Sequence, residues 1–212
     1  RTSSATVSFA GAAPRSTCVT MADLDLAKIG GFHPKQQQAE RLVFQALIRG
    51  VLPYAYVGYG GAGGGGKSRF VRWISLKFLL FVYKVLGLEN VRVAILCESY
   101  PALNDRQISK VKTEFGTLFG EFHEQTHEYR LKPEFGSGVI CFRNLDKPET
   151  YDSAEFGMIS IDEATKNAEV VFHELRKRAR WPGIRCAPMV LATNPGGIGH
   201  SWYRQLFIDR DF

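Results

Sequence analysis

Apolar positions along the chain follow two patterns, and the two alternate. Short, nearly continuous apolar runs rich in β-branched residues predict buried strands at 91–97, 158–161 and 189–192. Longer segments, either apolar over most of their surface or with an apolar stripe at helical spacing, predict helices. We expect these helices at Pro34–Arg49, Lys67–Leu86, 103–119 and 168–180.

Three weaker signals complete the expected sheet. A short run at 54–58 precedes a glycine-rich turn and predicts a first strand. Runs at 127–131 and 139–142 flank a turn at 133–138 and predict a hairpin. The alternation of strands and helices predicts an α/β fold, with a mostly parallel sheet and helices on both faces. Ligands of such sheets bind at the carboxyl ends of the strands.

Composition and charge narrow the class only slightly. The 212 residues are 45% hydrophobic and 23% charged, as in ordinary globular domains. We expect one domain over 21–212, preceded by a leader or cloning remnant at 1–20. The longest apolar stretch, near 76–85, contains two lysines and is too short to span a bilayer, so no membrane association is expected. The net charge of +6 weakly favours a partner rich in phosphate. The four cysteines are widely spaced, which fits a reducing compartment.

A phosphate-binding motif stands between the first expected strand and the longest helix. It fits G-x-x-x-x-G-K-[ST]. Its residues are Gly61, Ala62, Gly63, Gly64, Gly65, Gly66, Lys67 and Ser68. Residues with little or no side chain let backbone N–H groups turn inward around phosphate oxygens, and the helix N-terminus adds its positive end. This predicts ATP as the ligand, with Lys67 on the β- and γ-phosphates and Ser68 on Mg²⁺.

An overlapping dinucleotide fingerprint, G-x-G-x-x-G, begins at Gly58. That fingerprint needs an acidic residue about 20 positions further on. The acid that ends the next strand is Glu98, which is much farther away, and the fingerprint leaves Lys67 and Ser68 without a role. The nucleoside triphosphate interpretation is therefore preferred.

Two acidic residues, Asp162 and Glu163, end the apolar strand at 158–161. Buried carboxylates are costly unless they meet a cation. We expect Asp162 to hold Mg²⁺ through its water shell or through Ser68, and Glu163 to act as the general base that activates the attacking water. The alternative is a strand that simply leads into a helix cap.

Two polar segments supply further candidates. Gln36 or Gln37 can read the adenine edge, because an amide both donates and accepts; the alternative is a pair of solvated residues at a helix start. Thr193 and Asn194 end the last strand, where polar side chains can sense the γ-phosphate. The alternative there is a plain Asn-Pro-Gly-Gly turn.

Taken together, residues 32–207 resemble the N-terminal ATPase domain of phage terminase large subunits. Besides the motifs above, the resemblance rests on ESYPALND at 98–105, RAR at 178–180, ATNP at 192–195 and HSWY at 200–203. It implies a P-loop NTPase fold of the additional-strand, catalytic-glutamate type, and a homo-oligomeric ring that hydrolyses ATP to drive double-stranded DNA into a procapsid. It also implies a portal protein and a small terminase subunit as partners, the host cytoplasm as location, and a coupling role for Thr193 and Asn194.

The chain departs from this family in three places. Gly63 stands where members often carry an arginine, and Asp152 stands where a trans-acting basic residue is common. The arginine finger is therefore open among Arg143, Arg176, Arg178 and Arg180, each of which can equally be part of a solvated basic surface. Finally, the family's nuclease domain would follow Phe212, so no nuclease activity is expected of this chain.

Two other functions remain possible on the sequence. A Gln-motif helicase or related nucleic-acid ATPase shares the adenine and acidic motifs, but it needs a second ATPase-like lobe. A nucleotide-dependent assembly module would bind ATP to oligomerise and would hydrolyse little of it alone.

Overall fold

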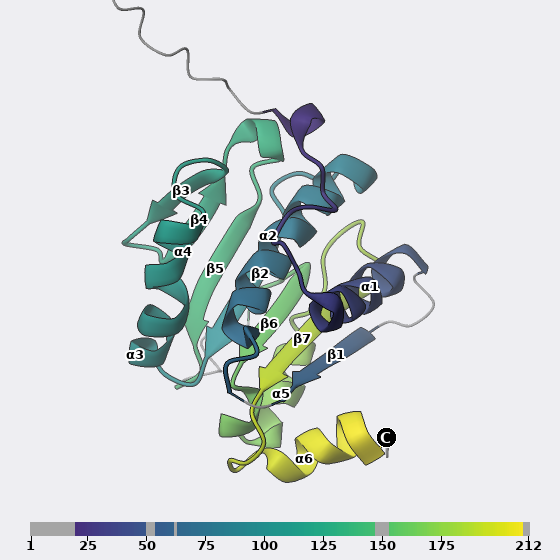
Figure 1. Ribbon diagram of the computed structural model, residues 1–212, viewed down its shortest axis with the longest axis vertical. Coiled ribbons are helices and arrows are strands. Elements are labelled where there is room, and N and C mark those ends of the chain that lie inside the picture. The colour runs from purple at the N-terminus through teal and green to yellow at the C-terminus, as the bar shows by residue number, and fades with distance from the viewer. Residues whose placement is uncertain (1–19, 50–53, 62, 147–152, 210–212) are drawn as a thin grey trace, which may run out of the picture.

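The computed structural model describes residues 20–49, 54–61, 63–146 and 153–209, and the described residues form one seven-stranded sheet (Figure 1). The spatial order is β1-β7-β6-β2-β5-β4-β3. The strands are β1 Tyr54–Gly60, β2 Arg92–Cys97, β3 Gly120–His123, β4 Glu128–Leu131, β5 Val139–Asn144, β6 Met158–Asp162 and β7 Ala187–Thr193. The five strands from β1 to β5 in this order are parallel. Strand β4 pairs antiparallel with β5 on one side and with β3 on the other. The mostly parallel sheet expected from the sequence is confirmed.

Strand β7 lies between β1, which precedes the glycine-rich loop, and β6, which ends in the acidic pair. This is the additional strand that the sequence resemblance implied, and it confirms the fold class. The register brings the carboxyl ends of the three strands level, because Gly60 pairs with Thr193 and Asp162 pairs with Ala192. The residues that follow these strands therefore meet at the carboxyl ends of the strands.

Helices cover both faces of the sheet, as predicted (Figure 1). Helices α1 (Pro34–Arg49), α2 (Lys67–Leu86) and α4 (Ser109–Glu114) lie on one face, and α5 (Glu169–Arg176) and α6 (His200–Arg204) lie on the other. On the first face Ser75 of α2 meets Ser160 of β6 at 3.4 Å. On the second face the ring of Phe172 in α5 packs 5.2 Å from that of Tyr56 in β1.

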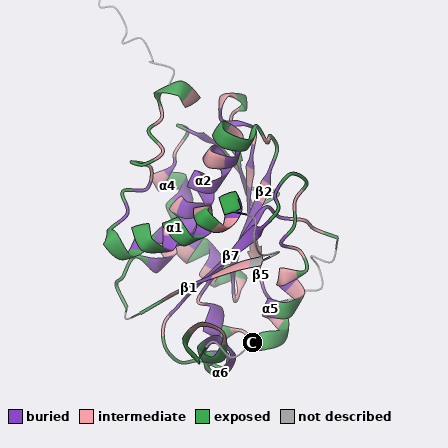
Figure 2. Ribbon diagram, turned by 90° about the vertical axis from the view of Figure 1, so that its right-hand side faces the viewer, coloured by how far each residue is buried: buried purple, intermediate pink, exposed green. Residues whose placement is uncertain are grey.

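Helix α2 runs through the middle of the molecule, and Figure 2 shows its central part buried, whereas α1 and α5 present exposed sides. Its bounds are those predicted. It ends because Gly87 adopts the left-handed conformation, with φ 65°, and donates its N–H to the carbonyl of Tyr83. Two of the cations buried in it meet a carboxylate: Arg72 pairs with Glu114, and Lys77 pairs with Glu40.

The predicted strands and the hairpin β4–β5 are confirmed, and the differences lie in two helices and one strand. The helix expected at 103–119 begins earlier, with α3 (Tyr100–Leu103), widens into a π turn (Asn104–Ile108) and ends with α4. Gly116, at φ 51°, belongs to the turn that follows, and this turn leads into β3, a strand that the sequence pattern missed. Strand β3 is short and half polar, so its pairing with β4 decides its conformation.

The helix expected at 168–180 was also too long, because α5 ends at Arg176. The chain beyond it turns to lie beside the residues that precede β6, where the N–H of Phe156 bonds to the carbonyl of Arg178 at 2.9 Å. Most of the expected leader, residues 1–19, lies outside the described residues, and so does Ala62 of the glycine-rich loop. Within the described ranges, no helix has the length and apolarity needed to cross a membrane.

Candidate active site

The glycine-rich loop leaves the carboxyl end of β1 and opens α2, so it joins a strand end to a helix N-terminus. Gly64 has a φ of 80° and Gly66 a φ of 66°, a backbone region that favours glycine. Side-chain atoms added at Gly61, Gly63 or Gly64 would meet nothing within 4 Å, so this part of the loop faces open space. An anion can therefore reach the backbone N–H groups and the positive end of α2.

Lys67 and Ser68 form the first turn of α2. Only 8% of Lys67 is exposed although the loop around it is open, and its Nζ donates to the carbonyl of Gly61 at 3.2 Å. The ammonium is thus folded across the loop, where a bound phosphate would also meet it. Ser68 is half-buried beside it.

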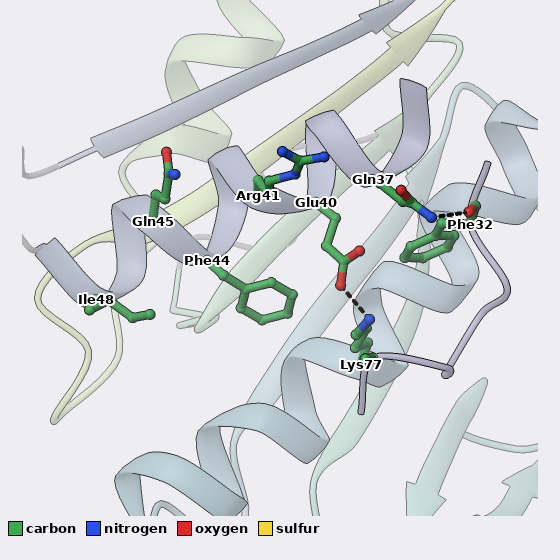
Figure 3. Close-up of a pocket in the computed structure, with 9 residues that line it drawn as sticks. Phe32, Gln37, Glu40, Arg41, Phe44, Gln45, Ile48 and Lys77 are labelled. Carbon is green, nitrogen blue, oxygen red and sulfur yellow. Dashed lines mark hydrogen bonds and ion pairs between the residues drawn. The ribbon is translucent and has the colours of Figure 1, made fainter. Parts of the chain in front are cut away.

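The two candidate glutamines have different surroundings. Gln36 is buried; its Nε2 donates to the carbonyl of Gly66 at 3.2 Å, and its Oε1 accepts the N–H of His33 at 3.3 Å. Gln37 is exposed and donates to the carbonyl of Phe32 at 2.8 Å. Figure 3 shows it at the Phe32 end of a pocket that is lined by α1 and by Lys77 of α2. Gln36 is therefore the glutamine that contacts the phosphate-binding loop, and a role in adenine recognition stays a prediction for both.

The acidic pair lies at the carboxyl end of β6, on the same side of the sheet as the glycine-rich loop. Asp162 is 1% exposed and accepts a hydrogen bond from Nε2 of Gln107 at 2.7 Å. Glu163 takes the left-handed conformation, with φ 57° and ψ 51°, which turns the chain sharply after the strand. Its carboxylate receives two hydrogen bonds from Asn194, one from Nδ2 at 2.7 Å and one from the backbone N–H at 3.5 Å.

The end of β7 is tied to the loop that follows Glu163. The hydroxyls of Thr193 and Thr165 are 2.6 Å apart, and the N–H of Thr165 donates to Oγ1 of Thr193 at 3.3 Å. Oδ1 of Asn194 is buried and, in the part of the chain that the structure describes, has no hydrogen-bond partner. The structure thus brings Asn194 to Glu163 and Thr193 to Thr165. The sequence pattern does not single out Thr165, because the contact of Thr165 with Thr193 depends on the pairing of β6 with β7.

A second group missed by the sequence lies on the other side of Asp162. Glu98, at the end of β2, forms ion pairs with Arg106 and with Lys166, whose Nζ is 2.8 Å away. Burial opposes the charge of Glu98, but the hydrogen bonds from Lys166 and Arg106 outweigh it and lower the pKa of the carboxyl. Arg106 also reaches Asp162, with Nε 3.9 Å from Oδ2. Its cation therefore stands beside the acidic pair.

The four arginines considered as fingers lie in two other places. Arg143, on β5, donates to the carbonyl of Thr126 at 2.9 Å and pairs with Glu128 at 3.2 Å. Arg180 pairs with Glu155 at 2.8 Å. Arg176 ends α5, and Arg178 follows it beside Phe156, which precedes β6. A finger that acts in trans is identified only in an assembly, so this assignment stays a prediction.

The donor set suits a magnesium ion held together with phosphates. Mg²⁺ is usually bound by one or two protein oxygens, with substrate phosphates and water supplying the rest. Ser68 and the Asp162 carboxylate are ligands of that kind, and the contacts of Asp162 with Gln107 and Arg106 both use Oδ2. Among the described residues, no cluster of three or more His, Cys, Asp or Glu side chains is arranged to hold a metal by itself.

No protein-family model and no curated protein sequence matches the chain. Solved structures do match it, and their likeness is one of fold. The large terminase of a thermophilic bacteriophage aligns with a TM-score of 0.63 and 13% identity, over 84% of this chain and 43% of that chain. The same terminase in complex with ATP-gamma-S aligns with a TM-score of 0.61 and 15% identity, over 85% of this chain and 42% of that one. The HK97 bacteriophage large terminase aligns with a TM-score of 0.53 and 10% identity, over 85% and 37%.

The chain thus spans less than half the length of each of these terminases. At such low identity the comparison establishes the fold: the described residues have the architecture of the matched part of phage large terminases. The resemblance stated from the sequence motifs is confirmed at this level.

Proposed function

We propose that this chain is a magnesium-dependent ATPase domain of the large-terminase kind, which hydrolyses ATP to move double-stranded DNA into a procapsid. The observation that carries the proposal is that the glycine-rich loop and the acidic pair both lie at the carboxyl ends of the strands. The loop precedes Lys67, and Asn194 holds the Glu163 carboxylate of the Asp162–Glu163 pair. A terminase with this fold has itself been solved with ATP-gamma-S.

The residues divide the chemistry between them. The loop N–H groups and Lys67 hold the β- and γ-phosphates, while Ser68 and Asp162 hold the metal. When bound, the magnesium ion neutralises charge on the phosphate oxygens. Glu163 orients a water and takes its proton as the water oxygen attacks the γ-phosphorus, and the bond to the ADP oxygen breaks. Oε2 of Glu163 is suited to the water, because its contact with Asn194 is the longer one.

The link between Thr193 and Thr165 offers a route from chemistry to movement. Loss of the γ-phosphate changes what Glu163 and Asn194 contact, and Thr193 joins the end of β7 to the loop after Glu163. A shift at the phosphate is thereby passed to the 3-10 turn Ala164–Lys166 and to α5 beyond it. In the assembled motor this is the coupling step.

The motor assignment carries partners with it. We infer a homo-oligomeric ring on double-stranded DNA that engages a portal protein and a small terminase subunit in the host cytoplasm. The net charge of +6 suits the DNA. The arginine finger that a neighbouring subunit supplies is sought among Arg143, Arg176, Arg178 and Arg180.

The enzymatic proposal is tested by ATP affinity and ATP turnover measured on the same variants. Glu163→Gln keeps an oxygen for Asn194 but removes the base, so ATP affinity is expected to persist while turnover falls at least about 100-fold. Lys67→Ala is expected to lose both. Glu169→Gln, an exposed acid on α5, is the matched control and keeps both.

Four outcomes distinguish the assigned mechanism from the alternatives. Equal turnover in wild type and Glu163→Gln would contradict the assigned mechanism. Tight ATP binding and oligomerisation with no turnover, even in the presence of DNA, would favour a nucleotide-dependent assembly module. Displacement of a third strand from a DNA triplex without separation of the duplex supports a translocase, whereas strand separation supports the helicase-like alternative.

A further inference from the structure

The π turn Asn104–Ile108 interrupts the helical segment that follows β2 and brings two consecutive side chains, Arg106 and Gln107, to Asp162. A π turn contains one residue more than an α-helical turn, and such turns often occur at functional sites. Here Gln107 is fully buried and donates from Nε2 to Oδ2 of Asp162 at 2.7 Å. Its neighbour Arg106 reaches the same oxygen at 3.9 Å while paired with Glu98.

The orientation of the Gln107 amide is determined by its other partner. Nη1 of Arg72 lies 3.4 Å from Oε1 of Gln107 and donates to the carbonyl of Arg106 at 2.7 Å. A guanidinium can only donate and a carboxylate can only accept, so the amide oxygen must face Arg72 and the amide NH₂ must face Asp162. An amide side chain satisfies both neighbours at once. A glutamate at this position would face Asp162 with a second negative charge.

Arg72 is itself held firmly. Its side chain is 5% exposed, and Glu114 accepts two of its hydrogen bonds, at 3.1 and 2.5 Å. Arg72 lies on α2, just over one helical turn beyond Ser68. A continuous chain of contacts therefore runs from the helix that carries Ser68, through Arg72 and Gln107, to Asp162.

We infer that Gln107 is a positioning residue that orients the Asp162 carboxylate for the magnesium ion, an inference that rests on the proposed ATPase function. With Oδ2 occupied by the amide, Oδ1 would be the oxygen left to hold the cation. Because Arg72 anchors the amide to α2, the contact chain also fixes Asp162 relative to Ser68, the other protein ligand. Partners that orient metal ligands in this way affect metal affinity about 10- to 100-fold.

The test measures the magnesium dependence of ATP binding, which a merely structural role would leave unchanged. A fluorescent ATP analogue is bound to the whole chain in EDTA and in a MgCl₂ titration. Gln107→Leu keeps the volume and loses the donor, so the MgCl₂ midpoint is expected to rise at least about tenfold while affinity in EDTA stays that of wild type. Ile108→Val, a buried change in the same turn, is the control and leaves the midpoint unchanged.

Each outcome has one meaning. A wild-type midpoint in folded Gln107→Leu overturns the inference while leaving the ATPase proposal intact. Failure of the wild type itself to bind the ATP analogue, with or without MgCl₂, removes the proposed function instead. If Gln107→Leu does not fold, Gln107→Met serves the same test: it is unbranched, adds no charge and cannot donate to Asp162, so a wild-type midpoint there overturns the inference.

Discussion

Replacing Glu114 with glutamine tests how strongly the buried ion pair with Arg72 holds α4 and the π turn against α2. The change keeps the side-chain shape and an oxygen for the indole N–H of Trp73, which donates to Glu114 at 2.8 Å. It removes the charge that balances a guanidinium only 5% exposed. The variant therefore leaves a buried cation without its counter-ion and little else altered.

The expected cost follows from burial. Removing one partner of a fully buried ion pair costs about 3–5 kcal/mol. The Glu114 side chain is 25% exposed, so water can reach the site and part of that penalty is recovered. We expect Glu114→Gln to lower the free energy of unfolding by about 2 kcal/mol, or the Tm by about 4–8 °C for a domain of this size.

Urea unfolding followed by circular dichroism measures this loss, with an unchanged m-value showing that the unfolded state is not involved. Glu124→Gln is the control, because Glu124 pairs with Lys112 at the surface, with side-chain exposures of 70% and 39%. That variant is expected to lose no more than about 0.5 kcal/mol. Equal losses in the two variants would refute the reasoning, since burial would then not decide the strength of the Arg72 pair.

Three further changes test other parts of the structure. Asn194→Ala removes the donor that orients Glu163, so ATP turnover should fall about tenfold at unchanged ATP affinity; a lower affinity would argue against an orienting role. Gly120→Ala would place its Cβ 2.0 Å from the carbonyl oxygen of Arg130, so urea unfolding should reveal a loss of about 2 kcal/mol or more. Burial opposes the charge of Glu128, but its arginine partners lower the pKa of the carboxyl, so its stabilisation is complete above the usual glutamate pKa of 4.5 and is lost as the pH falls through the folded value. The Tm difference between wild type and Glu128→Gln should accordingly narrow on acidification, and a constant difference would contradict this.

The parts of the fold that the sequence predicts are those encoded locally. The glycine run before Lys67 and the apolar strand ending in Asp162 each contain their own signal, so the loop and the acidic strand end were located without the structure. The bounds of α2 were also predictable, because Gly87 stops the helix within its own sequence.

The parts that escaped prediction depend on distant partners. The sequence of residues 104–108 does not by itself predict a π turn, because the turn is held by Arg72 and Asp162, which lie far away in the sequence. Strand β3 likewise exists through its pairing with β4. Thr165 acquires its contact with Thr193 only when β6 and β7 are neighbours.

The position of β7 also determines the order in which the chain can fold as it is synthesised. Among the described strands, β1 pairs with β7 alone, and the two are separated by more than a hundred residues. At about 5–20 residues per second, a ribosome completes β7 on the order of ten seconds after β1. Until then the aromatic segment YAYVGYG at 54–60 lacks the strand that pairs with it in the folded sheet. Unpaired strand edges promote aggregation, and the glycines in this segment weaken its tendency to form a sheet with other chains. Any fragment of this chain that ends before residue 187 lacks the strand that pairs with β1.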